Sequence, residues 1–272
     1  MVNGYMPEHL QEALQIRAEK DVIPYGGGTD LMIHGDVAAV YLFVNRVEEM
    51  RQIRVDQEFV RIGGSCTFHE VLQSPFPPAL LKEAVSRIAA PAIRNLGTMA
   101  GNIGNGSAKA DTVLIEFAAD AKLRLLSTRG ERIVPVRDFY RGRKKLDLAK
   151  DELIVEILLP KTGLEDYYYE KVGAREALAI SRVSFAGILQ REGESIRKIS
   201  AAFGAVADTV LRFPELEQKL CGRTRAEVRQ MKAEWLQDYA RAIRPTRGRV
   251  SAEYRKAVCL NLLDAFLEAK GM

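Results

Sequence analysis

Two segments of the sequence place several glycines beside small hydroxyl and amide side chains. One is Gly26-Gly27-Gly28-Thr29-Asp30; the other, residues 94–112, holds four glycines and three asparagines. Glycine admits positive φ angles and lets a ligand approach without a Cβ in the way. Consecutive amides in such loops can point into one concavity and bind an anion, and the hydroxyls of Thr98 and Ser107 can add hydrogen bonds. One cluster alone favours a tight turn, whereas two clusters in one domain favour a phosphate site.

Neither common phosphate-binding motif accounts for these segments. Gly101 and Gly106 have the P-loop spacing, but Ser107-Ala108 follows them and the motif's lysine is missing. The dinucleotide fingerprint G-x-G-x-x-G also fails, because the glycines of residues 101–106 run in the reverse order. The two loops therefore indicate a phosphate-binding site that uses neither of these common motifs.

The other reactive side chains are too scattered to form a metal or catalytic site. No carboxylate or cysteine stands at ligand spacing from any of the three histidines, His9, His34 and His69. An iron–sulfur cluster needs about four thiolates, and the chain has three distant cysteines, Cys66, Cys221 and Cys259. We therefore predict no metal site and no catalytic residue, and we expect any cluster to lie on another chain.

Composition excludes two further classes of protein. The 272 residues carry a net charge of +4, from 40 basic and 36 acidic side chains, which is too small and too scattered an excess to indicate nucleic-acid binding. There is no run of 18 apolar residues, so we predict no membrane span. The N-terminus lacks a secretory signal, and the odd number of cysteines is typical of reduced thiols, so we predict a cytoplasmic protein.

The pattern of apolar residues predicts an α+β chain in two parts, residues 1–163 and 164–272. We expect helices after Pro7 and over 68–74, 79–89 and 112–121, strands over 38–47, 59–66 and 151–160, and a hairpin over 122–136. Two further strands and then helices fill the second part. Thr224 and Glu227 have the spacing of a capping box, and an apolar stripe marks the last helix as core: Cys259, Leu262, Leu263, Phe266 and Leu267.

The two glycine segments together resemble the flavin-binding loops of one family. "PYGGGTDLM" and "RNLGTMAGNIGNGSAKADT" are similar to the loops of the FAD-binding subunit of the molybdenum hydroxylases, the xanthine dehydrogenase and carbon monoxide dehydrogenase family. The likeness continues in "DELIVEILLP", "EKVGAREALAISRVSFAG" and "SAEYRKAVCLNLL", so it covers nearly the whole chain. It implies a vanillyl-alcohol-oxidase-type (PCMH-type) FAD-binding domain with two α/β subdomains. A smaller domain of sheet and helices, like the carbon monoxide dehydrogenase flavoprotein C-terminal domain, would follow it.

The resemblance also implies which residues hold FAD. The first loop would wrap the pyrophosphate with Tyr25, Gly26, Gly27, Gly28, Thr29, Asp30 and Leu31. The second loop would face the pyrophosphate and ribityl chain with Thr98, Gly101, Asn102, Asn105 and Ser107. Asp111 would accept hydrogen bonds from sugar hydroxyls, and Ile154 would contact the adenine or the ring. Lys171 would lie near the isoalloxazine, under a covering loop of residues 172–182.

The chain departs from the family pattern within the second loop. Ala100 stands where the family usually has a second glycine, so that amide could be placed differently. Ala108 and Lys109 replace the usual proline and small residue. We interpret Lys109 as a solvated side chain rather than a phosphate contact.

The function implied is that of an electron-transfer flavoprotein subunit. Its partners would be a large molybdopterin subunit and a small [2Fe–2S] subunit, and electrons would pass from the clusters to FAD and on to NAD⁺ or another acceptor. The lack of a catalytic acid–base pair agrees with an electron-transfer role, because the flavin cofactor would carry out the redox reaction. Two alternatives are a self-contained flavin oxidase and a non-catalytic flavin- or nucleotide-binding protein.

Overall fold

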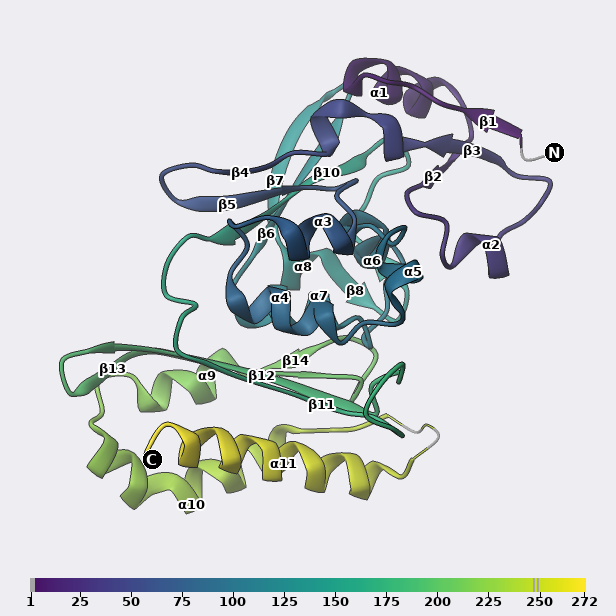
Figure 1. Cartoon of the computed structure of the whole chain (residues 1–272). Helices are drawn as coiled ribbons and strands as arrows, with labels where there is room; N and C mark the ends of the chain where they lie inside the picture. The colour runs from purple at the N-terminus through teal and green to yellow at the C-terminus, as the bar shows by residue number, and fades with distance from the viewer. Residues whose placement is uncertain (1–2, 247, 249) are drawn as a thin grey trace.

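The computed structural model of the protein describes residues 3–246, 248 and 250–272. The chain forms an upper part with two main sheets, a further two-stranded sheet of β8 (Tyr140–Gly142) and β9 (Lys145–Leu146) and several short helices, and a lower part in which one sheet lies over two long helices (Figure 1). This mixed architecture of two parts confirms the predicted fold class. None of the helices in the described ranges is long and apolar enough to cross a membrane.

The first sheet delivers the first glycine segment. Its strands run parallel in the order β1-β3-β2, with β1 at Asn3–Tyr5, β3 at Val40–Phe43 and β2 at Ile23–Tyr25. Helix α1 (Leu10–Glu19) joins β1 to β2 and buries Ala13 and Leu14. The segment starts where β2 ends and leads into the short α2 (Leu31–His34). In sheets of parallel strands, ligand loops usually follow the carboxyl ends of the strands.

The second sheet is the scaffold of the upper part. Its five strands are antiparallel in the order β4-β5-β10-β6-β7 (Ile53–Val55, Phe59–Gly63, Leu153–Pro160, Lys122–Ser127 and Gly130–Pro135). The central β10 is buried along almost its whole length, as its apolar sequence requires. Helices α3 (Phe68–Gln73), α4 (Ala79–Ser86), α6 (Met99–Gly104) and α7 (Asp111–Ala118) lie below it (Figure 1). The predicted hairpin and the predicted strand over 151–160 are both confirmed.

The lower part is a four-stranded antiparallel sheet backed by helices. Its strand order is β11-β12-β13-β14 (Tyr167–Val172, Val183–Glu192, Ser195–Gly204 and Leu211–Arg212). Helices α10 (Arg225–Ala242) and α11 (Ala252–Ala269) cover the outer face (Figure 1). The capping box of Thr224 and Glu227 is confirmed. In the predicted stripe of α11, Leu262 is half-buried and the other four side chains are buried.

Short elements complete the chain. They are η1 (Val44–Arg46), η2 (Glu48–Met50), α5 (Pro91–Arg94), α8 (Val136–Phe139), β8 (Tyr140–Gly142), β9 (Lys145–Leu146), α9 (Pro214–Glu217) and η3 (Gln218–Leu220). Several predicted elements were too long: the strand predicted over 59–66 ends at Gly63, and the helix predicted over 112–121 ends at Ala118. The strand predicted over 38–47 gives way at Val44 to 3-10 turns. The helix predicted over 79–89 ends at Ser86, since Ala89 takes a left-handed φ of 40°.

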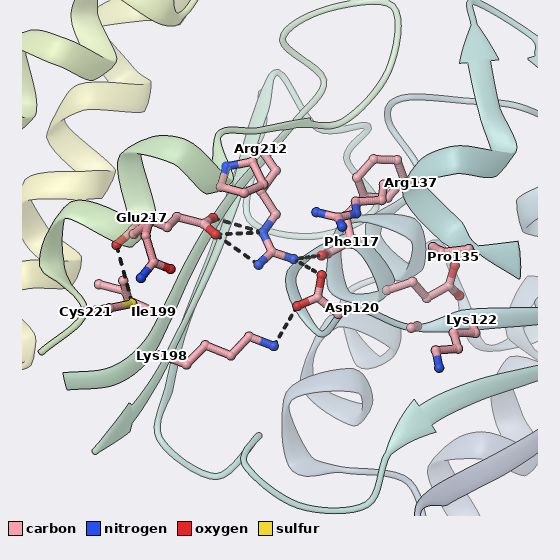
Figure 2. A pocket seen from close by; sticks show the side chains of 14 residues that line it. Phe117, Asp120, Lys122, Pro135, Arg137, Lys198, Ile199, Arg212, Glu217 and Cys221 are labelled. Carbon is pink, nitrogen blue, oxygen red and sulfur yellow. Dashed lines mark hydrogen bonds and ion pairs between the residues drawn. The ribbon is translucent and has the colours of Figure 1, made fainter. Parts of the chain in front are cut away.

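Helix α7 joins the two parts of the chain, and each of its residues is buried. It contacts β12 and β13 of the lower sheet as well as α4 and α6 above. At its C-terminal end, Arg212 of β14 donates to the carbonyl oxygen of Phe117 at 2.7 Å and to Asp120 Oδ1 at 2.5 Å, while Glu217 accepts from its other side (Figure 2). The Arg212 side chain is only 5% exposed, so its guanidinium is largely shielded from solvent where the two parts meet.

Glu116, in the middle of α7, is an unusual core residue. It is fully buried, and neither carboxyl oxygen has a hydrogen-bond partner among the described residues. Burial raises the pKa of this carboxyl from its usual 4.5 to about 8, because the charged form loses its hydration without gaining a partner. The side chain is therefore a neutral acid at pH 7.

Candidate functional site

The two glycine segments meet at one pocket. The cavity has a volume of about 240 Å³ and lies between the loop after β2, helix α6 and the start of β10. Most of the predicted binding residues line it: Gly26, Gly27, Gly28, Thr29, Asp30, Leu31, Thr98, Gly101, Asn102, Asn105 and Ile154. Whether these residues hold FAD stays a prediction, but their convergence gives it a definite place in the fold.

The first loop presents free backbone donors. No amide of residues 27–30 donates a hydrogen bond to another described residue. Unpaired amides in a concave loop suit the oxygens of a phosphate. The side chain of Asp30 accepts from Asn105 Nδ2 at 2.5 Å, which ties the first loop to the second.

Close packing within the protein requires the glycines of this loop. A Cβ on Gly27 would lie 1.7 Å from the carbonyl oxygen of Leu96, and one on Gly26 would lie 2.4 Å from Thr98 Oγ1. Gly28 has a φ of 70° and packs under the ring of Tyr25. The sequence pattern pointed to glycine for the sake of a ligand, whereas the structure shows an additional cause in the contact between the two loops.

Helix α6 orders the second loop. Thr98 caps it by accepting a hydrogen bond from the amide of Gly101 at 3.2 Å. Asn102 Oδ1 accepts from Thr112 Oγ1 at 2.8 Å, so that side chain is anchored to α7. Ala100 stands where the family usually has a second glycine. Its amide donates to the carbonyl oxygen of Gly64 at 2.9 Å. The departure at Ala100 is thus compatible with a well-packed loop, because this amide serves the fold.

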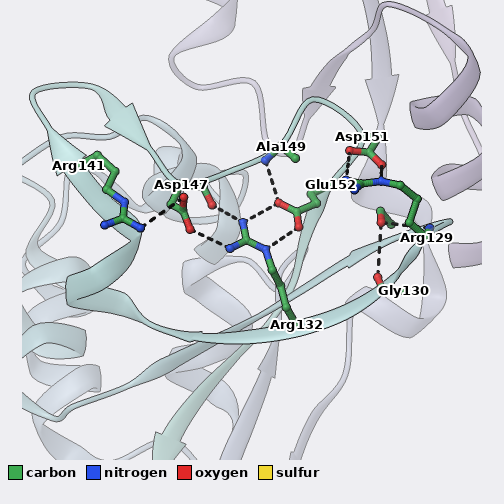
Figure 3. Close-up of polar contacts among 9 residues, drawn as sticks. Arg129, Gly130, Arg132, Arg141, Asp147, Ala149, Asp151 and Glu152 are labelled. Carbon is green, nitrogen blue, oxygen red and sulfur yellow. Dashed lines mark hydrogen bonds and ion pairs between the residues drawn. The ribbon is translucent and has the colours of Figure 1, made fainter.

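The part of the lining at the start of β10 is held by an arginine outside the pocket. Leu148, Glu152 and Ile154 form this part. Arg132 of β7 donates to both oxygens of Glu152, at 2.6 and 2.8 Å, and to Asp147 Oδ2 at 2.7 Å (Figure 3). Its hydrogen bonds are the main cause that lowers the pKa of Glu152. The carboxylate of Glu152 therefore stays ionised beside the cavity.

Four predicted residues are not in the lining: Tyr25, Ser107, Asp111 and Lys171. Asp111 and Lys171 face each other where the upper and lower parts of the chain meet, and Lys171 Nζ donates to Asp111 Oδ2 at 2.7 Å. Ser181 Oγ donates to Asp111 Oδ1 at 2.7 Å, and Lys171 also donates to the carbonyl oxygen of Arg87. The structure thus joins Asp111 to Lys171, a pairing that the sequence did not indicate, and their contact with FAD remains a prediction.

We expect the Asp111–Lys171 pair to stabilise the joint between the two parts. Its side chains are 6% and 9% exposed, so Asp111→Asn, which leaves a buried lysine without its counter-charge, should cost about 3 kcal/mol of unfolding free energy. Lys171→Met should cost a similar amount, and the double variant less than the sum. The measurement is a double-mutant cycle by urea unfolding of the FAD-free protein.

The exposed pair Arg129–Asp151 provides the control for this cycle, since its arginine is 69% exposed. Its coupling energy should stay below about 1 kcal/mol. Additive losses at Asp111 and Lys171 would contradict a cooperative contact.

Sequence reasoning missed several lining residues. Arg17, Met50, Phe68 and Glu152 all contribute to the pocket. Arg17 is one arginine on an amphipathic helix, and nothing in its local pattern marks it as a pocket residue. Within the described residues, no group of three or more metal-ligating side chains gathers at this site or elsewhere.

The residues present fit a flavin dinucleotide. The loops offer free amides, and the threonine hydroxyls add donors. Arg17 contributes a buried Nε that has no partner. Such a donor set suits a ligand with a diphosphate and several further acceptors.

Comparison with protein families gives two matches. Residues 1–162 match the family described as the FAD binding domain in molybdopterin dehydrogenase. Residues 167–269 match the carbon monoxide dehydrogenase flavoprotein C-terminal domain.

Individual relatives and solved structures agree with these matches. The chain is 34% identical over 203 residues to a putative xanthine dehydrogenase FAD-binding subunit of Escherichia coli K12, covering 71% of this chain and 69% of the relative. It is 30% identical to the nicotinate dehydrogenase FAD-subunit of Eubacterium barkeri, covering 80% and 79%. A chain of carbon monoxide dehydrogenase from Hydrogenophaga pseudoflava superposes with a TM-score of 0.89 at 25% identity, covering 98% of this chain and 96% of that one.

Proposed function

Because the chain belongs to the molybdenum hydroxylase family as an FAD-binding medium subunit, we propose that it carries electrons between two other sites of a multi-subunit enzyme. Electrons would arrive from [2Fe–2S] clusters on a small partner subunit and leave to NAD⁺ or another acceptor. The organic substrate would be hydroxylated on a large molybdopterin subunit. We place the assembly in the cytoplasm and the domains at residues 1–163 and 164–272.

The observation that carries this proposal is the convergence of the two glycine loops on one pocket with four free amides. When bound there, FAD supplies the redox chemistry that accepts and passes on electrons. The chain's own residues have simpler tasks. Residues 27–30 donate to the diphosphate, the Asp30–Asn105 hydrogen bond links the two loops, and Arg132 fixes the lining residue Glu152.

The identity of the substrate is left to the partner subunit. Relatives of this chain are named for xanthine, nicotinate and carbon monoxide, three chemically different substrates. A medium subunit that serves such a range has no need of a substrate site of its own. We propose a purine or another aromatic heterocycle as the first class to test.

An anaerobic reduction experiment tests this division of labour. The isolated chain, loaded with FAD, is mixed with xanthine or hypoxanthine, and its flavin absorbance is followed by stopped flow. We expect no bleaching, since the chain offers no route from a purine to the flavin. NADH can still reduce it directly, and adding the two partner subunits should restore reduction by the true substrate.

Each other outcome identifies an alternative. Rapid bleaching of the isolated chain by an organic substrate would favour a self-contained flavin oxidase. A flavin that stays oxidised with both partners and every substrate present would favour a non-catalytic binding protein.

A further inference from the structure

Arg17, near the end of α1, is a charged side chain in the pocket that the protein leaves partly unpaired. Its Nη1 donates to the carbonyl oxygen of Val22, but its Nε is buried and has no hydrogen-bond partner. Burial lowers the pKa of the guanidinium, and the more distant Asp21 and Asp151 only partly oppose that effect. No carboxylate in the described ranges forms an ion pair with it, and Asp151 is bonded to Arg129 instead. A buried donor without an acceptor costs free energy until a ligand satisfies it.

The pocket around Arg17 has apolar walls. Its lining includes the apolar residues Ile23, Pro24, Val44, Met50 and Leu153. Such walls suit the faces of a flat aromatic ring rather than a phosphate or a sugar. The free amides of the first loop, which suit phosphate, belong to residues 27–30 of the same pocket.

Glu152 completes the polar character of this region. It lines the same pocket as Arg17, and its carboxylate is kept ionised by Arg132 (Figure 3). The lining of the pocket therefore includes both a donor that lacks an acceptor and a carboxylate that accepts only. Adenine presents the complementary edge, because its ring nitrogen N7 accepts and its amino group N6 donates. A guanine or hypoxanthine edge presents an oxygen where adenine has the amino group, and that oxygen would face the carboxylate.

We propose that Arg17 is a specificity-determining residue that recognises the adenine of FAD, with Glu152, which lines the same pocket, as the acceptor. This inference rests on the proposed function, since it assumes that FAD is the ligand, and it goes further by assigning a role to two side chains. Arg17 donates to a ring nitrogen and Glu152 accepts from the amino group. FMN has no adenine, so Arg17 should contribute to the binding of FAD and not to that of FMN.

The test compares dissociation constants for FAD and FMN, measured by the quenching of flavin fluorescence. Arg17→Met keeps the length of the side chain and removes its donors. We expect it to raise the Kd for FAD about 10- to 100-fold, the usual effect of losing a hydrogen bond to a charged donor. The Kd for FMN should change less than twofold, and Arg17→Lys should lie between Met and the wild type. Deamino-FAD, which has oxygen in place of the amino group, should bind the wild type more weakly than FAD.

Controls separate a binding role from a structural one. Arg46→Met changes an exposed arginine of the same domain that is outside the pocket and should leave both constants unchanged. The Tm of Arg17→Met without flavin should stay within about 2 °C of the wild type, because a partly unpaired arginine contributes little to the fold. An unchanged Kd for FAD, or an equal rise for FAD and FMN, would overturn the inference while leaving the proposed function intact. A wild type that binds no FAD would contradict the proposed function and this inference with it.

Discussion

Gly27→Ala should produce a protein that folds but purifies without FAD. The added Cβ would lie 1.7 Å from the carbonyl oxygen of Leu96 and 2.3 Å from its carbonyl carbon. Backbone cannot give way as a flexible side chain does, so the loop must move away from residues 96–97. That movement turns the free amides of residues 27–30 out of the pocket. We expect FAD content below about a tenth of the wild type, with a loss of stability of about 1–3 kcal/mol, as is usual for overpacking.

The measurement is the ratio of flavin to protein absorbance, together with the FAD released on denaturation. Gly193→Ala is the matched control, because Gly193 has a φ of 59° in a hairpin turn far along the chain and open space around it. The Gly193→Ala variant places an alanine at a positive φ, which strains the backbone, but its Cβ collides with no other atom. This variant should retain full flavin content. If Gly27→Ala also keeps its FAD, the contact between the loops does not form the binding site.

Glu116→Gln should remove a large part of the pH dependence of stability. The unfolded carboxyl ionises near pH 4.5, whereas the folded one stays protonated until about pH 8. Between these values the folded state binds one proton more, so the free energy of unfolding falls as pH rises and levels off above pH 8. The slope is about 1.4 kcal/mol per pH unit, which amounts to at most about 5 kcal/mol across the interval. Glutamine cannot ionise and should not show this loss.

Urea unfolding of both proteins between pH 4.5 and 9 measures the effect. Other titrating groups are common to both, so their contributions cancel in the difference. We expect the two stabilities to be similar at the acid end and Glu116→Gln to be the more stable at pH 8. Glu194→Gln, at an exposed turn position, should follow the wild type throughout. Parallel curves for Glu116→Gln and the wild type would show that Glu116 gains a partner when it ionises.

Local signals made much of this molecule predictable from its sequence. The glycine loops, the capping box of Thr224 and Glu227, and the hairpin over 122–136 depend on neighbours within a few residues. The family resemblance then supplied the fold, because the two loop motifs occur together and the likeness extends along the chain.

Features that depend on distant neighbours were beyond such reasoning. Arg17 lies in the pocket only because α1 packs against β3, β6 and η2, which are distant in the sequence. Asp111 and Lys171 are 60 residues apart in the sequence and meet only when the lower sheet docks. Glu116 reads as an ordinary polar residue of an amphipathic helix, and only the contacts on both sides of α7 make it a buried acid. Gly27 was predicted as a residue of the ligand site, and its contact with Leu96 could not be known before the loops were placed.

The position of α7 has a consequence for how the chain unfolds. This helix lies in a hydrophobic cluster that also includes Ala186, Ile188 and Ala202 of the lower sheet. Charged side chains of the lower part hold it near each end, Lys171 at one and Arg212 at the other. If either part unfolds, one face of α7 loses its packing contacts, and the other part depends on that helix. The chain therefore has two structural domains but a single cooperative unit of stability, and an equilibrium intermediate with only one part folded is disfavoured.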